Sequence, residues 1–170
     1  MKKEYLNLFL KRRSVREYKK EYIKKEVLEN IIMMGMNAPS AGNQQPWEFI
    51  IITERNILNK IPEIHPYAQM LKNAPAAILV CGKPECKYPD YWIQDCAAAT
   101  ENILLAVHAE GLGGVWLGVY PLDERISGLR ELLYISEAAV PFALISVGIP
   151  AKEPEYIDRF DRKRIHYEKW

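Results

Sequence analysis

The pattern of apolar and polar positions along the chain predicts both helices and strands. Apolar residues recur every three or four positions over 4–11 and 24–36, the spacing of amphipathic helices. Four apolar runs predict strands: WEFIIIT (47–53), AAILVCG (76–82), GGVWLGVY (113–120) and PFALISVGIP (141–150). The isoleucines of the first run suggest a strand that is buried on both faces. A short helix near Glu54, a loop or broken helix over 61–70 and a helix over 121–133 are expected between them.

The longest helical segment, residues 90–110, is apolar on almost every side. Gly111 follows it and is placed to end the helix, since glycine adopts the left-handed conformation common just after a helix. A helix without a polar face is normally buried all round. In a chain of this size, that pattern favours a subunit interface alongside the core.

The last twenty residues, 151–170, follow the final core strand and are mostly polar. Their aromatic side chains would be costly to leave in water: Tyr156, Phe160, Tyr167 and Trp170. An arm laid across another subunit would bury them.

Composition narrows the class of protein. The 170 residues are 49% hydrophobic and 26% charged, which is ordinary for one soluble domain, expected to span residues 1–170. A net charge of +1 provides no overall field for nucleic acid or an anionic membrane, and no apolar stretch has the length of a signal peptide or a membrane span. Three cysteines without a CxxC pair indicate buried or half-buried free thiols. We therefore expect a cytoplasmic protein.

The common catalytic motifs are missing from the sequence. His65, His108 and His166 lack metal-ligand spacing, so we interpret them as structural and expect no metal. Neither a GxSxG nucleophile elbow nor a P-loop occurs, and the glycines of GLGGVWLG lead into a strand, which favours a tight entry turn over a phosphate cradle. Cys86 has a lysine beside it but is better explained as an ordinary surface cysteine.

Two polar segments each allow two interpretations. RRSVR (12–16) follows the first helix, where it is either a solvated basic helix end or a forked clamp for a phosphate. APSAGNQQPWEF (38–49) carries more hydrogen-bonding groups than a turn requires, so it is either a solvated bend or a loop that holds a polar ligand.

Together and in this order, these segments resemble the nitroreductase family of FMN-dependent oxidoreductases. KRRSVREY resembles the opening motif of that family, and APSAGNQQPWEF resembles its second motif. GLGGVWLGVYP, ISVGIPAKEP and RFDRKRIHYEKW are similar to family sequences at matching places, so the resemblance covers almost the whole chain. Ala41 stands where many members have a second serine, and the chain has no obvious substrate lid.

The resemblance implies an α+β fold with a central mixed or antiparallel sheet flanked by helices, in an intertwined homodimer that exchanges C-terminal arms. Each dimer would hold two FMN molecules at its interface. Arg12, Arg13 and Ser14 would hold the phosphate and ribityl chain, and Arg16 would lie beside the N1–C2=O edge of the flavin and tune it. The remaining positions implied for FMN are Pro39, Ser40, Asn43 and Gln45 from the partner subunit, backbone donors around Leu117, Gly118 and Val119, and Arg159 and Arg164 near the phosphate.

The family resemblance also implies the chemistry. NAD(P)H would deliver hydride to flavin N5, leave, and be replaced by a nitroaromatic or quinone acceptor in ping-pong turnover. No side chain need act as nucleophile or base, which agrees with the missing catalytic motifs. Two alternatives stay open: a related dehalogenation or ene reduction, and a protein that stores or senses FMN without turnover.

Overall fold

The structure is a computed structural model that describes residues 3–170, except for the side chains of residues 3–5. Its four strands form one antiparallel sheet in the order β1-β2-β4-β3. The central strands are β2 (Ala76–Gly82), which is buried along its whole length, and β4 (Val140–Gly148). β1 (Trp47–Ile52) and β3 (Gly113–Gly118) form the two edges.

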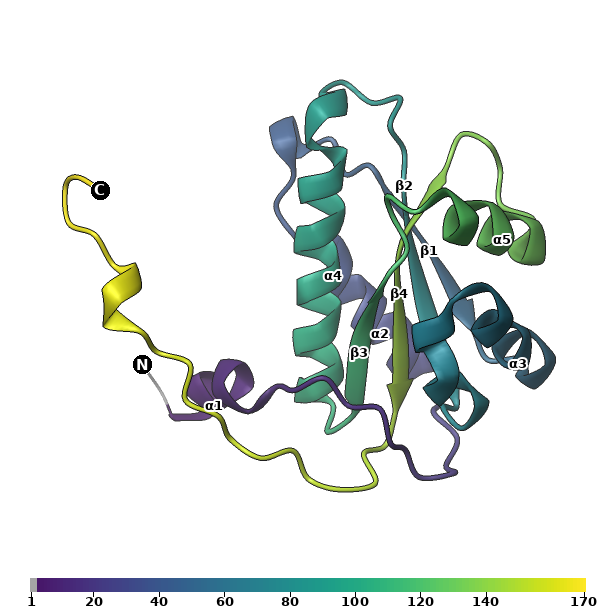
Figure 1. The fold of residues 1–170 in the computed structure, drawn as a ribbon, viewed down its shortest axis with the longest axis horizontal. Coiled ribbons are helices and arrows are strands. Elements are labelled where there is room, and N and C mark those ends of the chain that lie inside the picture. Colours follow the sequence, from purple (N-terminus) through teal and green to yellow (C-terminus); the bar gives the residue numbers. More distant parts are fainter. Residues whose placement is uncertain (1–2) are drawn as a thin grey trace.

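Helices cover both faces of the sheet (Figure 1). α2 (Lys25–Met36) and α4 (Trp92–Ala109) pack on one face, while α3 (Arg55–Ile64) and α5 (Asp123–Leu133) pack on the other. Side chains of β2 alternate between these layers, because successive residues of a strand point to opposite faces. Ala76, Ile78 and Val80 enter the α2/α4 core, whereas Ala77, Leu79 and Cys81 enter the α3/α5 core. This arrangement confirms the predicted α+β fold.

The remaining helical elements largely follow the sequence pattern. α1 (Lys3–Lys11) precedes the basic segment, and the expected broken helix over 61–70 is the end of α3 followed by a 3₁₀ segment, η2 (Pro66–Lys72). The other 3₁₀ turns are η1 (Ala41–Asn43), η3 (Pro89–Tyr91) and η4 (Arg162–Arg164). Gly111 has φ of 71° just after α4, as predicted for a residue that ends a helix.

β1 differs from its sequence interpretation. Only Trp47 and Ile52 at its two ends are buried; Glu48 is exposed and residues 49–51 are half-buried. The isoleucine run suggested burial on both faces, but β1 is an edge strand: within residues 3–170 it pairs with β2 alone and no strand lies on its other side. Apolar composition alone does not distinguish a central strand from an edge strand.

α4 is buried along one side and open along another within the chain. Ala97, Ala98 and Leu105 are half-buried, and Ile93 is exposed. A single chain therefore does not bury α4 on all sides, as its apolar sequence had suggested. The open side lines a shallow apolar groove together with Leu8 of α1 and Met34 of α2. Although α4 is the longest apolar helix, no helix of residues 3–170 has the length and hydropathy of a membrane span.

The last twenty residues leave the body as an extended arm (Figure 1). The arm is fixed at its root, where the Ala151 amide donates to the Glu17 carbonyl at 2.9 Å. Farther along, its large side chains face solvent, with Phe160 73% and Tyr167 72% exposed. The three cysteines are all free: Cys81 and Cys96 are buried and Cys86 is half-buried, as expected.

Candidate cofactor-binding site

The segment after α1 runs along the outer edge of β3. Ser14 forms a parallel bridge with Gly114, and the Val15 amide donates to the Gly114 carbonyl at 3.0 Å. Gly113 makes this close approach possible, because a Cβ at that position would lie 2.7 Å from Val15 side-chain atoms. Val15 is buried, while Ser14 and Arg16 are exposed on the extended segment. The Ser14 hydroxyl and the Arg16 guanidinium are thus exposed along the outer edge of β3.

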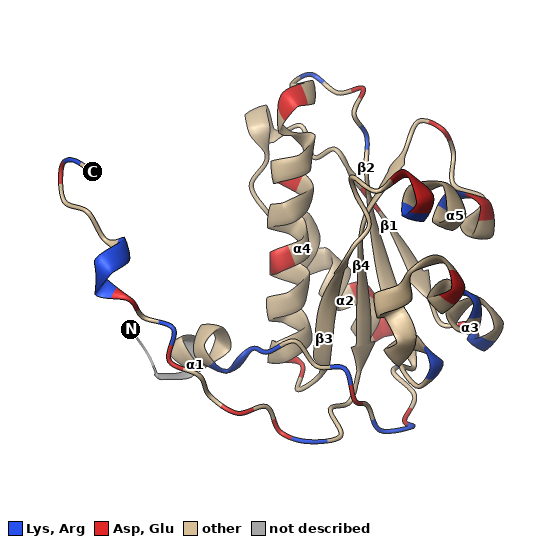
Figure 2. Cartoon of the chain, viewed as in Figure 1, with Lys and Arg blue, Asp and Glu red and all other residues tan. Residues whose placement is uncertain are grey.

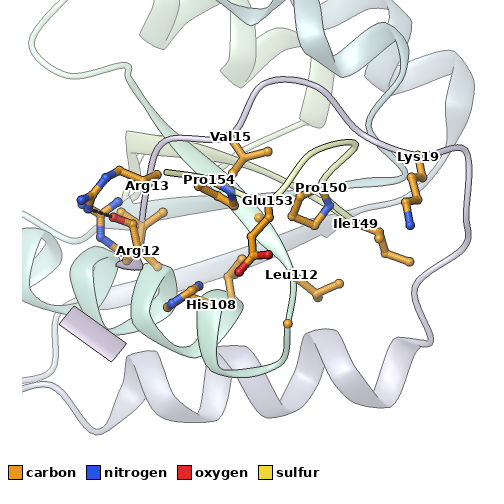
Figure 3. A pocket seen from close by; sticks show the side chains of 15 residues that line it. Arg12, Arg13, Val15, Lys19, His108, Leu112, Ile149, Pro150, Glu153 and Pro154 are labelled. Atoms are coloured by element: carbon orange, nitrogen blue, oxygen red, sulfur yellow. Dashed lines mark hydrogen bonds between the residues drawn. The ribbon is translucent and has the colours of Figure 1, made fainter. Parts of the chain in front are cut away.

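A basic pocket of about 350 Å³ lies where this segment crosses the start of β3 (Figure 3). Arg12 and Arg13 stand at one end of the view and Lys19 at the other, with His108 of α4 and Glu153 also in the lining. Figure 2 shows that Lys and Arg gather along this N-terminal segment and again on the distal part of the arm. The pocket suits an anion, since guanidinium groups bind phosphate oxygens well.

The two arginines of the pocket have different partners. The Arg12 guanidinium lies 3.6 Å from a Glu101 carboxylate oxygen, a loose ion pair that leaves donors free. Arg13 donates to the carbonyls of Glu155 and Ile157, both at 3.1 Å. In this chain Arg13 therefore holds the root of the arm, a contact that the sequence did not reveal.

His108 lies beneath this basic cluster and stays neutral. Burial lowers its pKa below the ordinary 6.5, and the positive charges of Arg12, Lys11 and Arg13 lower it further. The sequence placed His108 on the long helix but gave no sign that it borders a pocket.

The other end of β3 presents a backbone amide. Backbone N–H and C=O groups of successive residues in an antiparallel strand point to opposite sides, and those of Gly114 point away from β4 toward Val15. Gly118, four residues on, points the same way, and its Cα faces open space. Val119 points inward, because its amide donates to the Phe142 carbonyl at 3.2 Å, and Leu117 is buried.

Two side chains hold the Gly118 carbonyl in place. His65 Nε2 lies 2.9 Å from that oxygen and Arg125 Nη1 donates to it at 2.7 Å. Burial lowers the pKa of His65, with a further lowering from the Arg125 charge, so its neutral ring donates through Nε2. Its Nδ1 atom is buried and has no hydrogen-bond partner in the part of the chain that the structure describes. Neither His65 nor Arg125 was identified from the sequence as part of the site.

The polar loop lies at the opposite end of α4 from the basic pocket. Pro39, Asn43 and Gln45 are exposed and Ser40 is half-buried. The loop is attached to α4 at Asp95, whereas the pocket borders His108. These two positions are 13 residues apart, or roughly 20 Å along the helix. Within one chain the loop therefore lies toward the end of β3, where Trp92 of α4 contacts Tyr120, and not beside the basic pocket.

The two arm arginines lie at different distances along the arm from the basic pocket of their own chain, since Arg159 comes two residues after Ile157, whose carbonyl accepts from Arg13 of the pocket. η4, which ends at Arg164, lies far out on the arm, beyond the body (Figure 1). Arg164 forms an ion pair with Asp161 at 3.3 Å, within the arm itself. The roles implied for Arg159 and Arg164 stay predictions.

Comparisons with known proteins identify the family. A model of the nitroreductase family matches residues 9–65 and 63–149. An Archaeoglobus fulgidus protein assigned as an NADH dehydrogenase/NAD(P)H nitroreductase is 51% identical over 98% of this chain and 99% of its own length. A crystal structure of a Parabacteroides distasonis protein with the same assignment superposes with a TM-score of 0.94, at 38% identity over 99% of this chain and 100% of that one. An FMN-dependent nitroreductase from Clostridium difficile gives 0.90 at 29% identity, over 97% of this chain and 99% of that one. The chain belongs to the nitroreductase family.

Proposed function

We propose that this protein binds FMN along the outer edge of β3 and uses it to transfer electrons from NAD(P)H to an oxidised acceptor. The observation that carries the proposal is the pairing of two features on one edge. A basic pocket lies at its start, and an outward-facing amide lies four residues farther, roughly 14 Å away. A phosphate suits the first and a neutral ring nitrogen suits the second.

Four groups of this chain would bind and orient the parts of FMN. Arg12 would bind the phosphate, helped by Ser14. Arg16 would face the N1–C2=O edge of the ring, where the reduced flavin gathers negative charge. The Gly118 amide would donate to the ring at N5, held in direction by His65 and Arg125 through the adjoining carbonyl. When bound, FMN would supply the hydride chemistry itself, and the chain would supply orientation and charge.

Two chains would build each site. This is the arrangement that the resemblance to the family implies, with the polar loop of one chain in contact with the FMN held by the other chain. An open apolar surface is available for that contact on α1, α2 and α4: its exposed side chains include Leu6, Phe9, Leu10, Met33, Met34, Met36 and Ile93. The arm would then lie across the partner, and Arg159 and Arg164 would complete the partner's phosphate site.

The spectrum of the purified protein tests the proposed activity. We expect a yellow protein that takes up one FMN per chain and bleaches when NADH or NADPH is added without oxygen. Reoxidation by a nitroaromatic or quinone should restore the colour. A protein that stays colourless with excess FMN would exclude every flavin function. A yellow protein that neither nucleotide reduces would instead support the storage or sensing alternative.

A mixed dimer tests the shared site. We expect Arg12→Ala and Asn43→Ala homodimers to lose FMN, and the dimer of one chain of each to regain about one FMN. In a shared site both lesions fall on one pocket and the other pocket is intact. If both motifs served one pocket from the same chain, every pocket would carry a lesion and no FMN would return. Two different affinity tags isolate the mixed species for flavin counting.

A further inference from the structure

The polar loop adopts a conformation that needs to be held. Three of its residues have positive φ: Gly42 at 53°, Asn43 at 55° and Gln45 at 47°. Glycine tolerates this region and asparagine enters it more often than most residues, but a glutamine there is strained. The 3₁₀ turn η1 is too short to maintain such a shape alone, so neighbouring groups must fix it.

Asp95 is the group against which the loop is fixed. Its side chain is only 5% exposed, in the first turns of α4. One carboxylate oxygen accepts the Ala41 amide at 2.9 Å, and the other accepts Gln44 Nε2 at 2.8 Å. A buried carboxylate is costly unless it is hydrogen-bonded, so both loop donors are needed where they stand.

Gln44 cannot turn its amide away from Asp95. Its Oε1 accepts the Tyr88 amide at 2.8 Å, and its Nε2 also donates to the Tyr88 carbonyl at 3.1 Å. A reversed amide would set donor against donor at the Tyr88 nitrogen. The Tyr88 ring covers Gly42, where a Cβ would lie 2.3 Å from it. Asp95 must therefore offer acceptors to two fixed donors.

The held loop leaves its other polar groups facing outward. Ser40 Oγ accepts the Gln45 amide at 3.0 Å, which leaves the hydroxyl proton free to donate. Asn43 is exposed at the tip. We infer that Asp95, acting through Ala41 and Gln44, is a positioning residue that presents Ser40 and Asn43 to the FMN bound by the partner subunit. This inference rests on the proposed shared site, and Asp95 itself would not touch the cofactor.

Asp95→Asn tests this role with an almost unchanged shape. An asparagine offers one acceptor oxygen to two fixed donors, so the loop loses a hydrogen bond to a charged group. We expect FMN binding roughly ten- to a hundred-fold weaker, with the dimer still formed. Asp90→Asn is the matched control, because it removes an equal charge from an exposed site just before α4 and should leave FMN affinity unchanged. Unaltered FMN affinity in Asp95→Asn would overturn the inference.

Mixed dimers distinguish positioning from general damage to the fold. At an FMN concentration that leaves the Asp95→Asn homodimer empty, pairing with Arg12→Ala should restore about one FMN per dimer. Pairing with Asn43→Ala should restore none, since each pocket would then receive one faulty loop. Gln44→Ala, which leaves α4 unchanged, should behave in the same way and serves if Asp95→Asn does not fold.

The outcomes separate the inference from the proposed function. If Arg12→Ala with Asn43→Ala recovers FMN but Asp95→Asn is not rescued by Arg12→Ala, the shared site stands and the positioning role is wrong. Rescue of Asp95→Asn by Asn43→Ala would equally refute it. If the reference pair itself recovers no FMN, the shared site fails and this inference fails with it.

Discussion

Deletion of Arg159–Trp170 is expected to weaken the dimer strongly and to release FMN. Beyond its root, the arm runs outward with large apolar side chains in solvent: Phe160, Tyr167 and Trp170, the last fully exposed. An aromatic ring that becomes buried removes roughly 150–250 Å² from water, a gross gain of about 4–6 kcal/mol. In a symmetric dimer both arms would contribute this free energy, so the loss of both arms should shift the equilibrium toward monomers at micromolar concentrations.

Sedimentation or light scattering, together with flavin content, measures both effects. Two full-length variants separate the contributions of the arm. Replacing Phe160, Tyr167 and Trp170 with serine should weaken dimerisation first. Arg159→Ala combined with Arg164→Ala should keep the dimer and lower FMN affinity. A truncated protein that remains a dimer with full flavin content would show that the arm carries neither role.

The strands and helices could be predicted where local pattern and burial agree. β2 is apolar at every position and is the strand buried along its whole length, because it lies between two other strands and two helical layers. β1 has an equally apolar core but lies at an edge, and only the strand order, which no local pattern contains, distinguishes the two. The open side of α4 has the same origin, since its apolar surface exceeds what one chain can cover.

The site could be predicted only where its residues are close in sequence. RRSVR and the polar loop were recognisable as compact polar segments, and the structure shows where each lies. Asp95 and His65 form hydrogen bonds with residues that are distant in the sequence: Asp95 accepts from Gln44, 51 positions away, and His65 bonds Gly118, 53 positions away. Nothing in the neighbourhood of either residue indicates such a partner. Arg13 was grouped with Arg12 by sequence, yet its donors reach the arm 142 residues away.

Arg16→Ala is expected to retain FMN but to lower its midpoint potential and slow its reduction. Arg16 is exposed beside the Ser14–Gly114 bridge, and none of the ion pairs of residues 3–170 involves it. Its guanidinium is therefore available to the N1–C2=O edge, where charge-assisted hydrogen bonds would favour the reduced ring. Losing a bond to a charged group costs roughly 1.5–3 kcal/mol, equivalent to about 30–65 mV for a two-electron couple.

Potentiometric titration with reference dyes, followed by stopped-flow reduction with NADH, measures both changes. Arg16→Lys should lower the potential less, because it keeps the charge and loses only the planar fork. Lys20→Ala is the matched control, since it removes an exposed positive charge four residues along and should leave the potential unchanged. An unchanged potential in Arg16→Ala would place this guanidinium away from the flavin. An equal fall in Lys20→Ala would mean that the overall surface charge, and not a bond from Arg16, sets the potential.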